Sequence, residues 1–209
     1  MKQKVVIIDY GMGNTGSVKN ALDFLGYESV ISREAKDIAE ASHIILPGVG
    51  AFPDCMKNLR SYGLIDILNK EVLENKKPFL GLCLGMQVLG EIGEEGELTN
   101  GLGWIKGRVR RFAVDEKRFR VPHVGWNDVV ATENGRALFD GIDKPSFYFV
   151  HSFHLVPDDK SVVAGTADHG EPFVAAIRKD NIFGVQFHPE KSQRFGLLVL
   201  KNFCSTVCR

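Results

Sequence analysis

The first hundred residues alternate between two patterns of hydrophobic and polar positions. One is a short apolar run rich in β-branched residues, found in KVVIID near residue 4, HIILPG near 43 and PFLGLC near 78. The other places apolar residues at helical spacing, as in SVKNALDFLG and LIDILNKEVLEN. Because this alternation is typical of parallel pairing, we predict an α/β fold with a doubly wound, mostly parallel sheet and helices on both faces.

After Gly101 the pattern changes to short strand-like runs separated by turns. These runs are GWIKGRVRRF, GWNDVV, SFYFVHSF, SVVAGTAD, FVAAIRK and IFGVQFHP. They predict antiparallel strands added to an edge or face of the sheet, followed by a last helix near residues 193–206. No repeat or Pro/Ser-rich linker divides the chain, so we predict a single domain over residues 1–209.

Composition narrows the classes of function. The chain has 26 basic and 26 acidic residues and no basic block, which argues against a nucleic-acid partner. Only a short apolar run precedes Asp9, so the N-terminus matches neither a signal peptide nor a membrane span. We therefore expect a cytoplasmic protein without membrane contact.

The four cysteines, Cys55, Cys83, Cys204 and Cys208, form no C-x-x-C pair, so we expect no disulfide framework. We interpret Cys204 and Cys208 as packing or surface thiols.

The segment GLCLGMQ, residues 81–87, places a cysteine at the junction of a predicted strand and a predicted helix. Gly81 and Gly85 flank Cys83 at the spacing of a nucleophile elbow, where glycines permit a tight turn. A thiol at a helix N-terminus is biased toward the reactive thiolate. The backbone N–H of Leu84 would then face a developing oxyanion. The competing interpretation is a chance motif around a small buried cysteine.

A second segment, GVQFHPEKS at residues 184–192, supplies a base and a group to orient it. We predict that Pro189 ends a strand there, so that His188 and Glu190 emerge at its carboxyl end, where open parallel sheets form their sites. Glu190 is placed to hold the tautomer of His188. Zinc is the rival use of these residues, but the deaminase signature lacks its P-C-x-x-C, and His151 and His154 would face opposite sides of a strand. We expect no metal.

Six motifs together resemble the class I glutamine amidotransferases, over nearly the whole chain. They are DYGMGN, PGVGAF, GLCLGMQ, PHVGWN, FYFVHSF and GVQFHPEKS. The resemblance implies that Cys83 attacks the side-chain amide of glutamine, that His188 carries the proton to departing ammonia, and that Glu190 orients His188. It implies no cofactor. Within the family, DYGMGN, PHVGWN and FYFVHSF resemble the branch that serves histidine biosynthesis.

The resemblance also extends to the oxyanion hole and to the substrate contacts. The implied oxyanion donors are Leu84 N–H and the PGVG loop with Val49 and Gly50; a tight turn after a strand is the alternative interpretation of that loop. The implied contacts to glutamine are Gln87, His151, Ser152 and Phe153. A solvent-facing or capping residue is the alternative interpretation of Gln87, and without the resemblance FYFVHSF is interpreted as a core strand rather than a binding site.

The chain contains no domain that would accept ammonia. The resemblance therefore implies a heterodimer with a (βα)8-barrel cyclase, and we expect Asn14, Trp126 and Lys191 at the interface; a buried tryptophan is the alternative. Two competing hypotheses remain open. One is a glutaminase that serves a different synthase, and the other is a cysteine peptidase or a catalytically silent binding module on the same fold.

Overall fold

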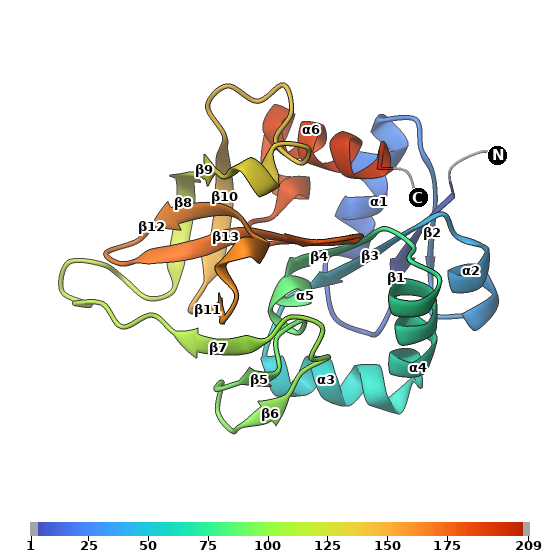
Figure 1. Cartoon of the computed structure of the whole chain (residues 1–209), viewed down its shortest axis with the longest axis horizontal. Helices are drawn as coiled ribbons and strands as arrows, with labels where there is room; N and C mark the ends of the chain where they lie inside the picture. Colours follow the sequence, from blue (N-terminus) through green and yellow to red (C-terminus); the bar gives the residue numbers. More distant parts are fainter. Residues whose placement is uncertain (1–3, 207–209) are drawn as a thin grey trace.

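The computed structural model describes residues 4–206, in which helices cover both faces of a central sheet (Figure 1). Cys208 lies outside the described residues. The strands are β1 (Lys4–Ile8), β2 (Glu28–Ser32), β3 (His43–Gly48), β4 (Phe79–Cys83), β5 (Ile92–Gly93), β6 (Thr99–Asn100), β7 (Gly107–Arg111), β8 (His123–Asp128), β9 (Val130–Ala131), β10 (Ser146–His151), β11 (Phe153–Pro157), β12 (Val163–Asp168), β13 (Pro172–Lys179) and β14 (Ile182–Val185). The α-helices are α1 (Thr15–Phe24), α2 (Ala35–Glu40), α3 (Phe52–Ser61), α4 (Leu64–Leu68), α5 (Leu84–Gln87) and α6 (Gln193–Cys204). Shorter helical segments are the π-helix η1 (Asn69–Glu74) and the 3-10 turns η2 (Glu133–Gly135), η3 (Lys160–Val162) and η4 (Pro189–Lys191).

The central sheet has eight strands in the order β2-β1-β3-β4-β14-β13-β12-β9. Strands β2, β1, β3, β4 and β14 run parallel, as the alternation of strands and helices predicts. The added strands β13, β12 and β9 pair antiparallel at one side. Strands β10 and β8 form a two-stranded sheet, and β11-β7-β5-β6 form a four-stranded one. The predicted antiparallel additions are thus confirmed.

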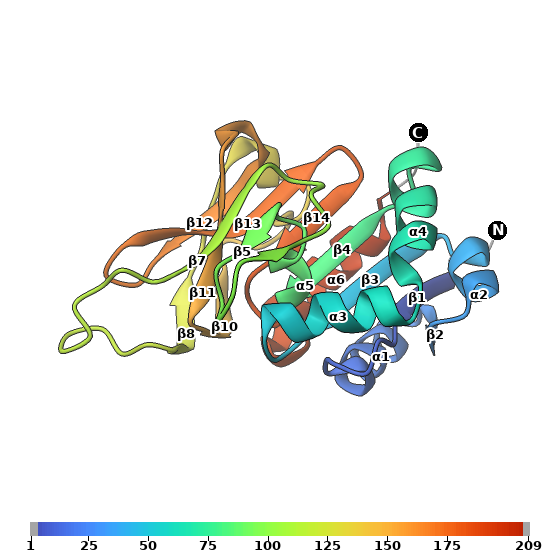
Figure 2. The same cartoon turned by 90° about the horizontal axis from the view of Figure 1, so that it is seen from below.

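The apolar runs of the parallel strands bury alternate residues on opposite faces of the sheet. In β1, Val5 and Ile7 pack against α1 and α6, whereas Val6 and Ile8 pack against α2, α3 and α4. The view from below shows α3 and α4 lying across their side of the sheet (Figure 2). Strands that are apolar on both faces therefore separate two core clusters, which is why these runs do not alternate with polar residues.

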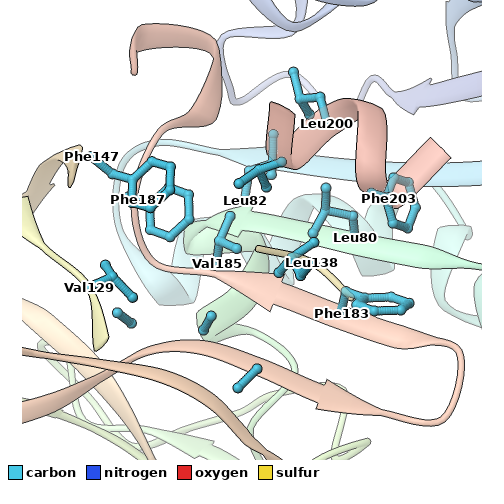
Figure 3. Packing of buried hydrophobic residues seen from close by; sticks show 14 of the residues in the cluster. Leu80, Leu82, Val129, Leu138, Phe147, Phe183, Val185, Phe187, Leu200 and Phe203 are labelled. Atoms are coloured by element: carbon cyan, nitrogen blue, oxygen red, sulfur yellow. The ribbon is translucent and has the colours of Figure 1, made fainter. Parts of the chain in front are cut away.

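One hydrophobic cluster holds together β4, which ends at Cys83, and β14, which precedes His188. Leu80 and Leu82 of β4 pack beside Val185 of β14, and α6 contributes Leu200 and Phe203 (Figure 3). All five side chains are buried. Close packing of this kind holds β4 and β14 in a single arrangement, so the residues that follow them keep a constant separation.

One detail differs from the sequence-based expectations. Strand β14 ends at Val185 rather than at Pro189, which instead opens the 3-10 turn η4. A proline at the first helical position loses no hydrogen bond, so it starts η4 rather than stopping the strand. The helix after Cys83 is only four residues long, because the chain turns at Gly90 and enters β5. The last helix, α6, lies where it was predicted.

Candidate active site

Cys83 occupies a strained turn between β4 and α5. Its φ of 52° and ψ of −107° lie in a region that side-chain-bearing residues rarely adopt. Such a conformation costs about 1–3 kcal/mol and persists only where the surroundings impose it. Because β3 pairs with β4 so that Gly48 lies opposite Cys83, the same turn faces the PGVG loop.

The two flanking glycines make this turn possible by close backbone contact. A Cβ atom at Gly81 would overlap the carbonyl group of Gly85. A Cβ atom at Gly85 would overlap the carbonyl oxygen of Leu46 in β3. Neither glycine has a positive φ, so the requirement is for space rather than for an unusual backbone conformation.

We predict that Gly85→Ala destabilises the fold by about 3 kcal/mol, because backbone atoms of β3 cannot move aside as a flexible side chain would. Urea unfolding measures the effect. Gly16→Ala is the matched control, since nothing lies within 4 Å of a Cβ built at Gly16 in α1; it should stabilise the fold by about 0.5–1 kcal/mol. Equal stability of Gly85→Ala and the wild type would contradict this account of the turn.

His188 and Glu190 form a buried pair beyond the end of β14. His188 Nδ1 lies 2.9 Å from Glu190 Oε1, and the two side chains are 3% and 2% exposed. Burial lowers the pKa of His188, but interactions with Cys83 and Glu190 outweigh it and raise the pKa to about 9. Among residues 4–206, His188 Nε2 has no hydrogen-bond partner. Because Nδ1 is held by the carboxylate, Nε2 is the nitrogen left to exchange a proton.

Backbone contacts hold this pair in place. The N–H of His188 donates to the carbonyl oxygen of Tyr148 in β10 at 2.9 Å. The Ser192 hydroxyl donates to the His188 carbonyl at 2.6 Å and accepts from Tyr148 N–H at 2.9 Å. A Cβ at Gly196 would overlap the carbonyl of Pro189, so α6 lies directly against η4. His188 is therefore held in position between β10 and α6.

The PGVG loop lies directly against the elbow. A Cβ at Gly48 would come within 2.7 Å of the Tyr10 hydroxyl and 2.8 Å of Leu84 Cβ. Gly50 has a φ of 104°, which glycine adopts without strain. Val49, between them, is exposed, whereas Leu84 is buried. The loop and the N-terminus of α5 thus meet at one side of Cys83.

A pocket of about 280 Å³ opens over Cys83. Its walls include most of the residues that the resemblance singles out, together with three that it did not. The pocket is lined by Val49, Gly50, Cys83, Gln87, Glu95, Pro122, Val150, His151, Ser152, Phe153 and His188. Of these, Glu95, Pro122 and Val150 were not expected from sequence. Glu95 lies in the acidic stretch GEEGELTN, whose composition is typical of a solvated loop. In the structure, however, Glu95 Oε2 accepts a hydrogen bond from Phe52 N–H at 2.8 Å.

Gln87 is buried, so the solvent-facing interpretation of this residue is wrong. Its Nε2 donates to the carbonyl oxygen of Phe153 at 2.8 Å and to Gln186 Oε1 at 3.1 Å. Both amide hydrogens are therefore used inside the protein, and only the Gln87 carbonyl oxygen remains for another group.

The segment FYFVHSF, which spans the end of β10, Ser152 and the start of β11, serves both the core and the pocket. Phe147 and Phe149 are core residues, while His151 closes the pocket wall. His151 Nδ1 donates to Phe153 O at 2.9 Å, and His151 Nε2 faces His123 Nδ1 at 3.2 Å. Burial lowers the pKa of His151 to about 3 and that of His123 to about 4. Both rings are thus neutral near pH 7.

Cys83 differs from the two other cysteines that the structure describes. Burial raises the pKa of Cys55 and of Cys204 to about 12, so these thiols stay protonated at neutral pH. Neither lines the pocket. Of the described cysteines, Cys83 is the one that meets a buried histidine and an open cavity.

The three residues expected at a partner interface do not all meet. Trp126 is 49% exposed, so the buried alternative is wrong for it. Its ring lies 6.4 Å from that of Tyr148, and Lys191 Nζ lies 5.9 Å from the same Tyr148 ring. Trp126, Tyr148 and Lys191 therefore form one surface patch. Asn14 precedes α1, where its backbone carbonyl oxygen accepts from Val18 N–H at 3.2 Å, and it is not part of this patch.

Among residues 4–206 no group of three or more His, Cys, Asp or Glu side chains is arranged to hold a metal ion. Within the same range no helix has the length and apolar character needed to cross a membrane.

Comparison with known proteins identifies the family. A family model described as "Glutamine amidotransferase class-I" matches residues 6–207. Imidazole glycerol phosphate synthase subunit HisH of Moorella thermoacetica is 50% identical over 200 residues, covering 95% of this chain and 93% of the relative. HisH 2 of Methanococcus maripaludis is 45% identical over 199 residues, covering 95% and 98%. The chain belongs to the HisH family of class I glutamine amidotransferases.

Solved structures agree with the HisH assignment at the level of the fold. A glutamine amidotransferase crystal structure is 21% identical with a TM-score of 0.74, covering 95% of this chain and 98% of that one. PurLQS from Thermotoga maritima is 21% identical with a TM-score of 0.73, covering 97% and 98%. The α/β fold with a doubly wound, mostly parallel sheet is therefore the class I glutamine amidotransferase fold.

Proposed function

We propose that the protein hydrolyses glutamine to glutamate and ammonia and passes the ammonia to a cyclase for histidine biosynthesis. The observation that carries this proposal is the alignment of Cys83, His188 and Glu190 at the carboxyl edge of one parallel sheet, beside a pocket. Membership of the HisH family supports the reaction, and the names of its relatives support imidazole glycerol phosphate synthase as the assembly.

In the proposed reaction the Cys83 thiol gives its proton to His188 Nε2, and the sulfur attacks the amide carbon of glutamine. The oxyanion that forms accepts hydrogen bonds from Leu84 N–H and from a backbone N–H of the loop at Val49 and Gly50. His188 then gives its proton to the leaving nitrogen, which departs as ammonia. Water attacks the thioester with His188 as base, and glutamate leaves. Glu190 keeps the imidazole oriented and stabilises its charged form throughout.

Glutamine has three polar groups that the pocket can tell apart. We assign the α-ammonium group to the carboxylate of Glu95 and to the carbonyl oxygen of Gln87, which are both acceptors in the pocket wall. Ser152 and Phe153 would hold the amino-acid end through their backbone, beside His151. The side-chain amide would then extend toward Cys83. This assignment selects a free amino acid over an amide within a peptide, because a peptide lacks the α-ammonium group.

Ammonia is useful to a synthase only if it is kept from bulk water, where most of it is protonated at neutral pH. We propose that a (βα)8-barrel cyclase covers the pocket side and forms a heterodimer with this chain. The patch of Trp126, Tyr148 and Lys191 supports this placement, because an exposed aromatic residue beside a cation is a typical interface anchor. Asn14 is proposed at the margin of the interface.

Trp126→Ala is expected to weaken binding to the cyclase by about 2 kcal/mol, which is roughly a thirtyfold loss of affinity, with little change in stability. Calorimetric titration with the purified cyclase measures the affinity, and thermal melting measures the stability. Phe24→Ala is the control, because Phe24 is a 79% exposed aromatic residue at the end of α1 and is not part of the patch. Equal loss of affinity in both variants would rule out the patch as the interface.

Transfer of label from glutamine tests the proposed function as a whole. The chain is mixed with the cyclase, its nucleotide substrate and glutamine labelled with nitrogen-15 in the side-chain amide. We expect the label in the imidazole product, and we expect free labelled ammonium in the medium to stay low. If glutamate forms but the label never enters the imidazole product, the result supports glutamine hydrolysis by this chain and indicates that a different synthase is its partner. If a peptide amide is cleaved instead, the chain is a peptidase.

A further inference from the structure

Gln186 is a fully buried polar residue that no motif-based interpretation assigns to the reaction. It follows the last residue of β14, and its backbone N–H donates to Ala175 O at 2.9 Å. Its side chain does not line the pocket. Gln186 Nε2 lies 3.6 Å from Cys83 Sγ, and Gln186 Oε1 lies 3.1 Å from Gln87 Nε2.

The orientation of these amides follows from the groups around them. The carbonyl oxygen of Phe153 can only accept, so Gln87 must present its NH₂ group to it. The second hydrogen of that NH₂ group then points to Gln186, which must present its oxygen. The NH₂ group of Gln186 is therefore directed at Cys83 Sγ. A continuous series of hydrogen bonds therefore runs from Phe153 in β11 through the side-chain amides of Gln87 and Gln186 to Cys83 Sγ.

We propose that Gln186 is a further catalytic residue, whose amide N–H stabilises the Cys83 thiolate and holds the sulfur in line with the pocket. Gln87 acts through Gln186 as a positioning residue. An N–H group donates a stronger hydrogen bond to an anionic sulfur than to a neutral thiol, so it favours loss of the thiol proton. The sulfur is anionic before attack and uncharged in the thioester, so the bond acts on formation of the nucleophile.

A buried environment strengthens this contribution. Gln186 is surrounded by protein on all sides, where a hydrogen bond to a charge is weakened less than it would be in water. The donor also complements His188, which approaches from the end of β14 and receives the proton. Gln186 donates to the sulfur while it carries the negative charge. The part of this inference that concerns glutamine turnover rests on the proposed glutaminase reaction, whereas the part that concerns the thiolate does not.

The test is the pH profile of Cys83 alkylation by iodoacetamide, read by mass spectrometry of the Cys83 peptide in the full chain. Gln186→Met keeps the length of the side chain and removes the donor. We expect the midpoint of the profile to move up by about one pH unit, and alkylation at neutral pH to slow by about tenfold. Gln186→Glu keeps an acceptor for Gln87, and above the pH at which its carboxyl group ionises it offers the sulfur no donor, so there it should move the midpoint in the same direction.

The controls separate this role from simple packing. Thermal melting reports whether each variant folds. If Gln186→Met does not, Gln186→Glu decides the result above the pH at which its carboxyl group ionises, because it then lacks the donor while keeping the shape and the bond to Gln87. Folded variants with an unchanged alkylation midpoint would overturn the proposal. Glutamine hydrolysis is measured in parallel, and we expect kcat to fall about tenfold with KM little changed. A shifted midpoint in a chain that does not hydrolyse glutamine would uphold Gln186 and refute the glutaminase function.

Discussion

Cys83→Ala is expected to lower glutamine hydrolysis by about 10⁴–10⁶-fold while the fold is retained. The reaction needs a covalent intermediate, and of the cysteines that the structure describes Cys83 alone lines the pocket. The methyl group of alanine fits the space of the thiol, so neither the pocket nor the His188–Glu190 pair should move. Glutamate release from the chain in complex with the cyclase measures the rate, and circular dichroism verifies the fold.

Two further variants sharpen this result. Cys83→Gly should be as inactive as Cys83→Ala but more stable by about 1 kcal/mol, because glycine adopts the observed φ of 52° without strain. Cys204→Ala, in α6 and away from the pocket, should keep its full rate. Substantial glutamate release by Cys83→Ala would show that another group is the nucleophile.

Glu190→Gln should reduce kcat by up to about 10⁴-fold, the second largest effect that we expect. Glu190 accepts from His188 Nδ1–H, which leaves Nε2 free to take the thiol proton. A glutamine side chain can turn its NH₂ group toward Nδ1 and so place the ring proton on Nε2, where it blocks that step. The loss should appear in kcat rather than in KM, because Glu190 does not line the pocket.

The same variant changes the pH dependence of stability. The pKa of His188 is raised to about 9 from the ordinary value of 6.5, so the charged ring favours the folded state. This stabilisation is fully present below about pH 6.5 and is lost as the pH rises through about 9. Glu190→Gln lowers the pKa of His188, so the wild type should lose its advantage over the variant across that window. NMR titration of the His188 ring measures the pKa, and an unchanged value would contradict the pairing.

Much of the fold was accessible from sequence because local patterns and the final structure agree. The apolar runs of β1, β3 and β4 are buried on both faces, and such runs are the usual sign of a parallel sheet. The elbow was equally accessible, since the glycine spacing around Cys83 reflects backbone contacts with Gly85 and Leu46 that a side chain would block.

Other features depend on tertiary contacts that leave little trace in sequence. The carboxylate of Glu95 reaches the pocket because it accepts from Phe52 N–H, a residue 43 positions away. Gln186 reads as an ordinary strand residue, and its contact with Cys83 arises from the pairing of β14 with β4. The exposure of Trp126 could not be decided from its neighbours either, because glycine and asparagine flank both buried and exposed tryptophans.

Attack of Cys83 on glutamine bound in this pocket is the step on which the whole proposed mechanism depends. Its most direct test is labelling with a glutamine analogue that carries a chloromethyl ketone in place of the side-chain amide, so that the sulfur displaces chloride and forms a stable thioether, followed by peptide mapping. We predict a single adduct on Cys83, whose formation is slowed by glutamine and is absent in Cys83→Ala. An adduct on Cys55 or Cys204, or labelling of Cys83 that glutamine does not slow, would contradict the account.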